Sequence, residues 1–201
     1  MISYKESDMD FSPLFKEGMN TVYIEKSKFY KKFEPHGVKT VEFWHLRQSS
    51  KSPQLCFIEA KVSAPDIANP KSHQDYVYCQ DCPNKPESKS STFCDECPKN
   101  TINIYCSKIY AKMQHSLELY VSKLLGIGED KYNEFPAIFT KTRLSSCSIR
   151  FILVIKKHDA RKDKGGLKAA IQRKLLPLRK IWNADVTVMG EAEARTHGYI
   201  L

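Results

Sequence analysis

Two strand-forming segments separated by a short polar connection constrain the fold of this chain more than any other feature. Residues 38–47 and 54–63 are rich in β-branched and aromatic side chains, whereas residues 48–53 between them are polar and end in a proline. The two segments therefore predict an antiparallel hairpin. One face of the hairpin carries Trp44, Leu46, Leu55 and Phe57, and the other carries Val41, Phe43, Cys56, Ile58 and Val62. Two apolar faces are typical of strands in the middle of a covered sheet.

The rest of the chain predicts helices and further strands around this hairpin. In chain order they are a helix of at most residues 11–18, a loose strand within 20–33, the hairpin, a helix over 101–125, a strand over 148–155, a helix after residue 165 that Pro177 divides, a strand over 185–189 and a helical turn over 191–197. The divided helix is expected to bury Leu167, Ile171, Leu175, Leu178 and Ile181. This order predicts an α/β protein with a mixed central sheet flanked by helices.

Three charged residues interrupt the apolar hairpin, namely Glu42, Glu59 and Lys61. If the polar connection is centred between residues 50 and 51, Glu42 faces Glu59 across the hairpin, and the alternation of side chains puts Lys61 on the same face. Like charges directly opposite each other destabilise a sheet, and burial increases the cost. A divalent cation such as Mg²⁺ would resolve the conflict, because hard cations take carboxylate oxygens as ligands. The alternative is an offset register that leaves both carboxylates in solvent.

Four of the seven cysteines form two Cys-x-x-Cys pairs, Cys79 with Cys82 and Cys94 with Cys97, eleven residues apart. This spacing is typical of a zinc site with four thiolate ligands. Two disulfides and a redox dithiol are the alternatives. Because the intervening segment is polar, the metal would have to supply its folding free energy. We expect residues 73–100 to form a small structural zinc knuckle, with His73 and Cys106 as alternative ligands. Cys56, Cys106 and Cys147 are otherwise expected to be buried.

The positive charge of the chain is concentrated in one window. The net charge is +9, and residues 156–180 contain ten Lys and Arg residues against two Asp residues. Such a window favours binding to a polyanion, whereas the alternative is a solvated helix face. The residues expected to contact nucleic acid are Lys156, Lys157, Lys168, Arg173, Lys174, Arg179 and Lys180. The knuckle is net acidic, so it is not expected to be the main nucleic-acid-binding surface.

The length of 201 residues suits one compact domain, residues 1–201, that contains the knuckle as an insert. No apolar run approaches the roughly 20 residues of a membrane-spanning helix. The N-terminal segment carries acids and lacks the apolar core of a signal peptide, so we expect a cytoplasmic protein without a membrane association.

Glu42 followed by Glu59-Ala60-Lys61, on the second and third strands of an αβββαβ order, resembles the PD-(D/E)XK nucleases, which share the restriction-endonuclease-like fold. The resemblance runs from about residue 20 to residue 189, with the zinc knuckle inserted after the third strand. In that family the two acids bind Mg²⁺, and the lysine activates or positions the attacking water. The resemblance therefore implies these roles for Glu42, Glu59 and Lys61. The family usually has Asp at the first position, where this chain has Glu42.

The resemblance implies a nuclease dependent on Mg²⁺ or Mn²⁺, an endonuclease or exonuclease, that hydrolyses phosphodiester bonds in DNA or RNA. The alternative function is a non-catalytic module with a degenerate nuclease fold and a structural zinc, which binds nucleic acid or a partner protein. A homodimer is compatible with either function.

Overall fold

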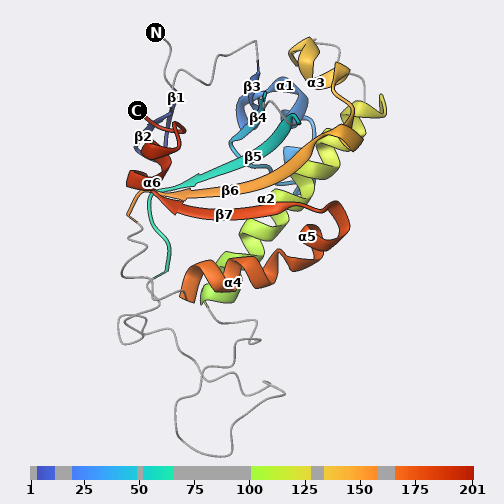
Figure 1. The fold of residues 1–201 in the computed structure, drawn as a ribbon. Helices are drawn as coiled ribbons and strands as arrows, with labels where there is room; N and C mark the ends of the chain where they lie inside the picture. The colour runs from blue at the N-terminus through green and yellow to red at the C-terminus, as the bar shows by residue number, and fades with distance from the viewer. Residues whose placement is uncertain (1–3, 12–19, 49–51, 66–100, 128–133, 158–165) are drawn as a thin grey trace, which may run out of the picture.

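The computed structural model describes residues 4–11, 20–48, 52–65, 101–127, 134–157 and 166–201, and these residues form an open five-stranded sheet with helices (Figure 1). The strands are β3 (Thr21–Tyr23), β4 (Phe43–Arg47), β5 (Gln54–Lys61), β6 (Ser148–Ile155) and β7 (Asp185–Gly190), in the spatial order β3-β4-β5-β6-β7. Strands β3, β4 and β5 pair antiparallel, whereas β5, β6 and β7 pair parallel. The predicted α/β class with a mixed sheet is confirmed.

The predicted hairpin register is correct. Trp44 pairs with Phe57 and Leu46 pairs with Leu55 across β4 and β5. Strand β4 begins only at Phe43, however, so the prediction of a strand from residue 38 is wrong. The backbone before β4 bonds to a helix instead of a strand, since the N–H of Val41 donates to the hydroxyl of Ser116 at 2.9 Å. Val41 therefore packs with the Trp44 side of the core, which is opposite to the predicted face.

The segment before the hairpin is a short strand followed by helical turns, so the strand predicted within residues 20–33 extends only over β3. It continues as η1 (Ile24–Lys26), α1 (Lys28–Lys31) and η2 (Glu34–His36). Helix α1 begins after Ser27, because the hydroxyl of Ser27 accepts the N–H of Tyr30 at 3.1 Å and caps the helix. The chain leaves η2 at Gly37, whose φ of +76° suits glycine.

Helices cover one face of the sheet, and they are α2 (Thr101–Leu124), α4 (Gly166–Lys174) and α5 (Leu176–Trp182) (Figure 1). Helix α2 packs on β5 and on α4. As predicted, the helical periodicity after residue 165 is interrupted near Pro177, and α5 begins after Leu175. The prediction that Ile181 is buried is wrong, since its side chain is 73% exposed. In α5 the buried Leu178 and the partly buried Trp182, four residues later, face the core instead.

The opposite face of the sheet is covered by the hairpin of β1 (Tyr4–Glu6) and β2 (Met9–Phe11) together with α6 (Glu191–Thr196). The backbone N–H of Leu201 donates to the carbonyl of Asp10, which joins the C-terminal residues to β2. The sequence did not predict the β1–β2 hairpin, and Phe11 lies in β2 instead of a helix. Between α2 and β6 the chain forms α3 (Ala137–Lys141) and η4 (Leu144–Ser146).

The core has one cluster on each side of the sheet. The larger lies under α2 and includes the rings of Trp44, Phe57, Tyr120 and Phe151. The predicted burial of Cys56 and Cys106 is confirmed, but Cys147 is only half-buried. The predicted zinc ligands Cys79, Cys82, Cys94 and Cys97, with the rest of residues 73–100, lie outside the described residues. No helix in the described part of the chain combines the length and apolarity of a membrane span.

Candidate active site

Glu42, Glu59 and Lys61 meet on the face of the sheet that α2 covers. The last β4–β5 pair is Phe43 with Ile58, so Glu42 and Glu59 lie just beyond it. The Lys61 ammonium is 2.5 Å from Glu59 Oε1 and 3.4 Å from Glu42 Oε1. The structure thus brings together the three residues that the sequence singled out.

The position of Glu42 follows from the end of β4. Its Oε2 accepts the backbone N–H of Ala60 at 2.8 Å. The carboxylate therefore takes the place of a strand carbonyl at the point where the β4 ladder stops. This bond fixes the side chain of Glu42 against β5 and leaves Oε1 directed at the lysines.

Lys112 of α2 completes the cluster, and the sequence analysis missed it. Its ammonium lies 2.9 Å from Glu59 Oε1, 3.4 Å from Glu42 Oε1 and 3.7 Å from Glu25 Oε1. Lys112 occurs on a helix face whose neighbouring turns bury Ile109 and Ser116. A lysine within such a buried stripe is the sequence signal, because a lysine there needs a charged partner.

The two carboxylates respond differently to their surroundings. Burial raises the pKa of Glu59 well above its usual range, and the charge and hydrogen bond of Glu42 raise it further. Burial alone would also raise the pKa of Glu42, but the hydrogen bond with Glu59 and the ammoniums of Lys112 and Lys61 hold it below its ordinary value. The two carboxyl groups therefore titrate as a coupled pair, and Glu59 holds a proton more strongly than Glu42 does.

The neighbouring lysine stays charged. Burial lowers the pKa of Lys112, but the carboxylates of Glu59 and Glu42 outweigh burial and raise it above the ordinary lysine value. The cluster combines two ammoniums, the carboxylate of Glu42 and the carboxyl of Glu59, which holds a proton more strongly than an ordinary glutamate. A cation that approached this site would favour the ionised form of Glu59.

The donor set suits a hard divalent cation. Glu59 Oε1 is buried and lies near both ammoniums, yet it makes no properly directed hydrogen bond with any described residue. Mg²⁺ is commonly bound through one or two carboxylates, with waters completing its shell. Within the described ranges, no group of three or more His, Cys, Asp or Glu side chains is placed to hold a metal. In this cluster Glu42 and Glu59 are the carboxylates that could act as such ligands.

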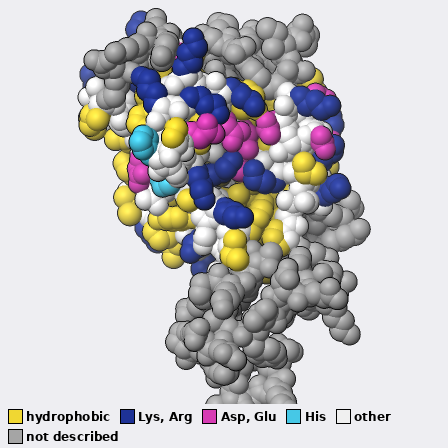
Figure 2. Space-filling model, turned by 180° about the vertical axis from the view of Figure 1, so that it is seen from behind, with side chains coloured by type: hydrophobic (Ala, Val, Ile, Leu, Met, Phe, Trp, Pro, Cys, Tyr) yellow, Lys and Arg dark blue, Asp and Glu magenta, His cyan; other side chains and the backbone are white. Residues whose placement is uncertain are grey.

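Basic residues from the predicted window lie at the end of β6 and on α4 and α5. Strand β6 runs into Lys156 and Lys157, whose N–H groups donate to the carbonyls of Lys61 and Val62 at 2.9 and 3.0 Å. Lys157 is exposed at this edge, whereas the ammonium of Lys156 bonds to the carbonyl of Asp8. Figure 2 shows acidic side chains in the middle of one molecular face, with Lys and Arg side chains around them.

The remaining basic residues lie on α4 and α5. Exposed side chains are those of Lys168, Arg173, Lys174 and Lys180, whereas Arg179 is partly buried. Helix α4 packs directly on α2, the helix that carries Lys112. The window is thus divided between the edge beside Lys61 and the two helices α4 and α5.

Comparison with protein-family models, curated proteins and solved structures finds no match to this chain. The geometry of the cluster therefore carries the functional argument.

Proposed function

We propose that the chain is a metal-dependent nuclease, in which Glu42 and Glu59 bind Mg²⁺ or Mn²⁺ and Lys61 assists the attacking water. One observation carries the proposal: two buried carboxylates from adjacent strands lie together with the ammonium of Lys61. Burial of such groups is costly, and strongly shifted carboxyl groups concentrate at functional sites.

The order of the elements supports the same proposal. Strands β3, β4 and β5 are antiparallel, α2 follows, and β6 is parallel to β5. This arrangement is similar to the βββαβ part of the core of the PD-(D/E)XK nucleases. In that comparison the two acids and the lysine fall on the second and third strands, with Glu42 one residue before β4.

The residues of the cluster would divide the work. A bound Mg²⁺ would supply an acidified water and neutralise charge on the scissile phosphate. Ala60 holds one oxygen of Glu42, and a bound cation would take the other oxygen, which faces the two ammoniums in the metal-free protein. Lys61 is more exposed than Lys112, with 31% of its side chain accessible against 19%. In this proposal Lys61 would orient water and phosphate, whereas Lys112 would hold the carboxylates in position.

The substrate proposed is DNA, with RNA as the alternative, held through its backbone. Lys157 and the exposed Lys and Arg side chains of α4 would contact phosphates. Such contacts do not depend on the nucleotide sequence. Reversing the charge of Arg173 and Lys174 to Glu should weaken binding and reduce its dependence on salt, because fewer counterions are released. Reversal of the exposed Lys31 on α1 is the matched control. Equal affinity and equal salt slope in the α4 variant would exclude α4 from the interface.

The competing function is a non-catalytic module, and Lys112 favours it. Its ammonium contacts both carboxylates at the distances given above, so the cluster is balanced without a metal. A binding module with a degenerate site would keep the same ion pairs for stability alone.

Cleavage of supercoiled plasmid, single-stranded DNA and single-stranded RNA, with Mg²⁺ or Mn²⁺ and with EDTA, separates the two functions. The nuclease requires metal-dependent cleavage that is lost in Glu42→Gln and Glu59→Gln and strongly reduced in Lys61→Ala. Lys31→Ala, an exposed lysine outside the cluster, should cleave like the wild type. Absence of cleavage in the wild type, or unchanged cleavage in both Gln variants, would favour the module.

A further inference from the structure

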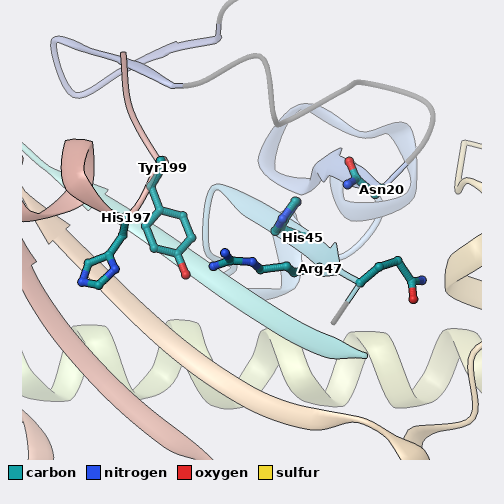
Figure 3. Close-up of a pocket in the computed structure, with 7 residues that line it drawn as sticks. Asn20, His45, Arg47, His197 and Tyr199 are labelled. Atoms are coloured by element: carbon teal, nitrogen blue, oxygen red, sulfur yellow. The ribbon is translucent and has the colours of Figure 1, made fainter. Parts of the chain in front are cut away.

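A second polar site lies on the face of the sheet opposite to the carboxylates. It is a pocket of about 310 Å³ lined by Asn20, His45, Arg47, Gln48, His197, Gly198 and Tyr199. Strand β4, the residues next to β3 and β4, and the C-terminal segment after α6 form its walls (Figure 3). No acidic residue is among these lining residues.

The side chains that line the pocket include several hydrogen-bond donors. Figure 3 shows the hydroxyl of Tyr199 and the guanidinium of Arg47 directed toward each other within the pocket. Arg47 donates a hydrogen bond to this hydroxyl. The ring of His197 lies beside them and is 54% exposed, so it reaches both the pocket and solvent.

The surroundings of the pocket are also positive. Arg150 of β6 lies opposite Cys56 of β5 and acts electrostatically on Tyr199 together with Arg47. The acids near these groups are at the surface: Asp185 is 3.6 Å from Arg150 and 67% exposed, and Glu193 is 4.0 Å from His197. Neither acid lines the pocket.

His45 forms the inner wall as a neutral ring. Burial, and the charge of Arg47, lower the pKa of His45 to about 4. Its Nδ1 lies 2.9 Å from the Thr21 hydroxyl, which fixes the ring. Among His45 and Arg47 of β4, the positive charge of the pocket is therefore carried by Arg47.

We propose that this pocket binds a phosphate monoester of about mononucleotide size, with the phosphate on Arg47, His197 and the Tyr199 hydroxyl. A guanidinium matches two phosphate oxygens at once, which makes Arg the favoured residue for such a group. The volume is at the lower end of small-ligand sites and exceeds what a bare phosphate fills. The amides of Asn20 and Gln48 then face the remainder of the ligand. The proposal does not depend on the nuclease function, since the two sites lie on opposite faces of the sheet.

The phosphate has two sources, a free mononucleotide or the phosphorylated end of a strand. Calorimetry on the full chain without divalent cations should compare AMP, adenosine, a 5′-phosphorylated tetranucleotide and its 5′-hydroxyl counterpart. We expect each phosphorylated ligand that binds to do so at least tenfold more tightly than its unphosphorylated counterpart. Binding of AMP identifies the free mononucleotide as a ligand, and binding of the tetranucleotide alone identifies the strand end.

Arg47→Met should weaken that binding at least tenfold, because it removes the charge and keeps a similar apolar stem. Arg143→Met, which changes an exposed arginine next to η4, is the matched control and should bind like the wild type. Thermal unfolding of each variant verifies the fold. The proposal is overturned if no phosphorylated ligand binds at millimolar concentration, or if Arg47→Met binds like the wild type.

Discussion

The Lys112 ammonium lies 2.9 Å from Glu59 Oε1 and links the middle of α2 to the end of β5. The pair is almost fully shielded from solvent, with 19% of the lysine side chain and none of the glutamate side chain exposed. Removal of one partner from such a pair leaves a buried charge without compensation, and this costs more than the pair contributes. Stability measurements on the metal-free protein can therefore test the cluster independently of catalysis.

Lys112→Met should lower the free energy of unfolding by about 3 kcal/mol, because Glu42 keeps its charge in a buried position with only Lys61 nearby. Mn²⁺ should restore part of the loss, since binding to the folded state alone stabilises it. Urea unfolding with and without Mn²⁺ measures both effects. Lys31→Met, on the exposed side of α1, should change little, and equal stability of the two variants would contradict the arrangement.

Glu42→Gln and Glu59→Gln should differ in stability although both remove a metal ligand. The pKa of Glu59 is raised in the folded state, so a neutral amide avoids the cost of burying this group at pH 7, and Glu59→Gln should be at least as stable as the wild type there. Glu42→Gln removes the carboxylate that both ammoniums face and should cost about 2 kcal/mol. Urea unfolding of both variants without metal, followed by metal-binding calorimetry, tests this order, and the reverse order would assign the proton to Glu42.

The pH dependence of the Glu59 variant gives a second readout. Because the pKa of Glu59 is raised in the folded state, its contribution to stability is complete below the ordinary Glu range and is lost as the pH rises above it. Glu59→Gln removes this loss. The variant should therefore gain stability relative to the wild type as the pH rises from 4 to 7.

His45 should make the protein sensitive to mild acid. Its pKa is about 4 in the folded state against 6.5 for an ordinary histidine, so between these values the unfolded chain takes up a proton that the folded chain does not. Stability should fall as the pH drops from 6.5 to 4, by up to about 3 kcal/mol. His45→Gln should reduce this slope, whereas His36→Gln, on an exposed turn, should retain it. Unfolding midpoints in urea across this pH range measure the slope for each variant. Equal slopes in His45→Gln and the wild type would contradict the prediction.

The zinc prediction concerns residues outside the described part of the chain and is tested by metal analysis. Protein purified under reducing conditions should contain close to one zinc per chain, and Cys82→Ser should lose it. The buried Cys56→Ser is the matched control, because Cys56 lies in β5 and should not affect the zinc content. Absence of zinc in the wild type would exclude the tetrathiolate site.

The register of β4 and β5 was predictable because alternation and the centre of the connection agree on one pairing. That register was enough to bring Glu42, Glu59 and Lys61 together. The end of β4 was not predictable, because the backbone of residues 39 and 41 bonds to His115 and Ser116 of a distant helix. The contact of Lys112 with Glu59 was not predictable either, because it depends on which turn of α2 faces the end of β5.

The parallel pairing of β5 with β6 has a consequence for synthesis of the chain. The β4–β5 hairpin leaves the ribosome long before α2 and β6, which cover its apolar face and fill its open edge. Until then Glu42 and Glu59 are near each other without the Lys112 ammonium, and a hydrophobic strand edge is unpaired. Fragments that end before α2 should therefore aggregate, and nascent chains of this length are the ones that need a chaperone.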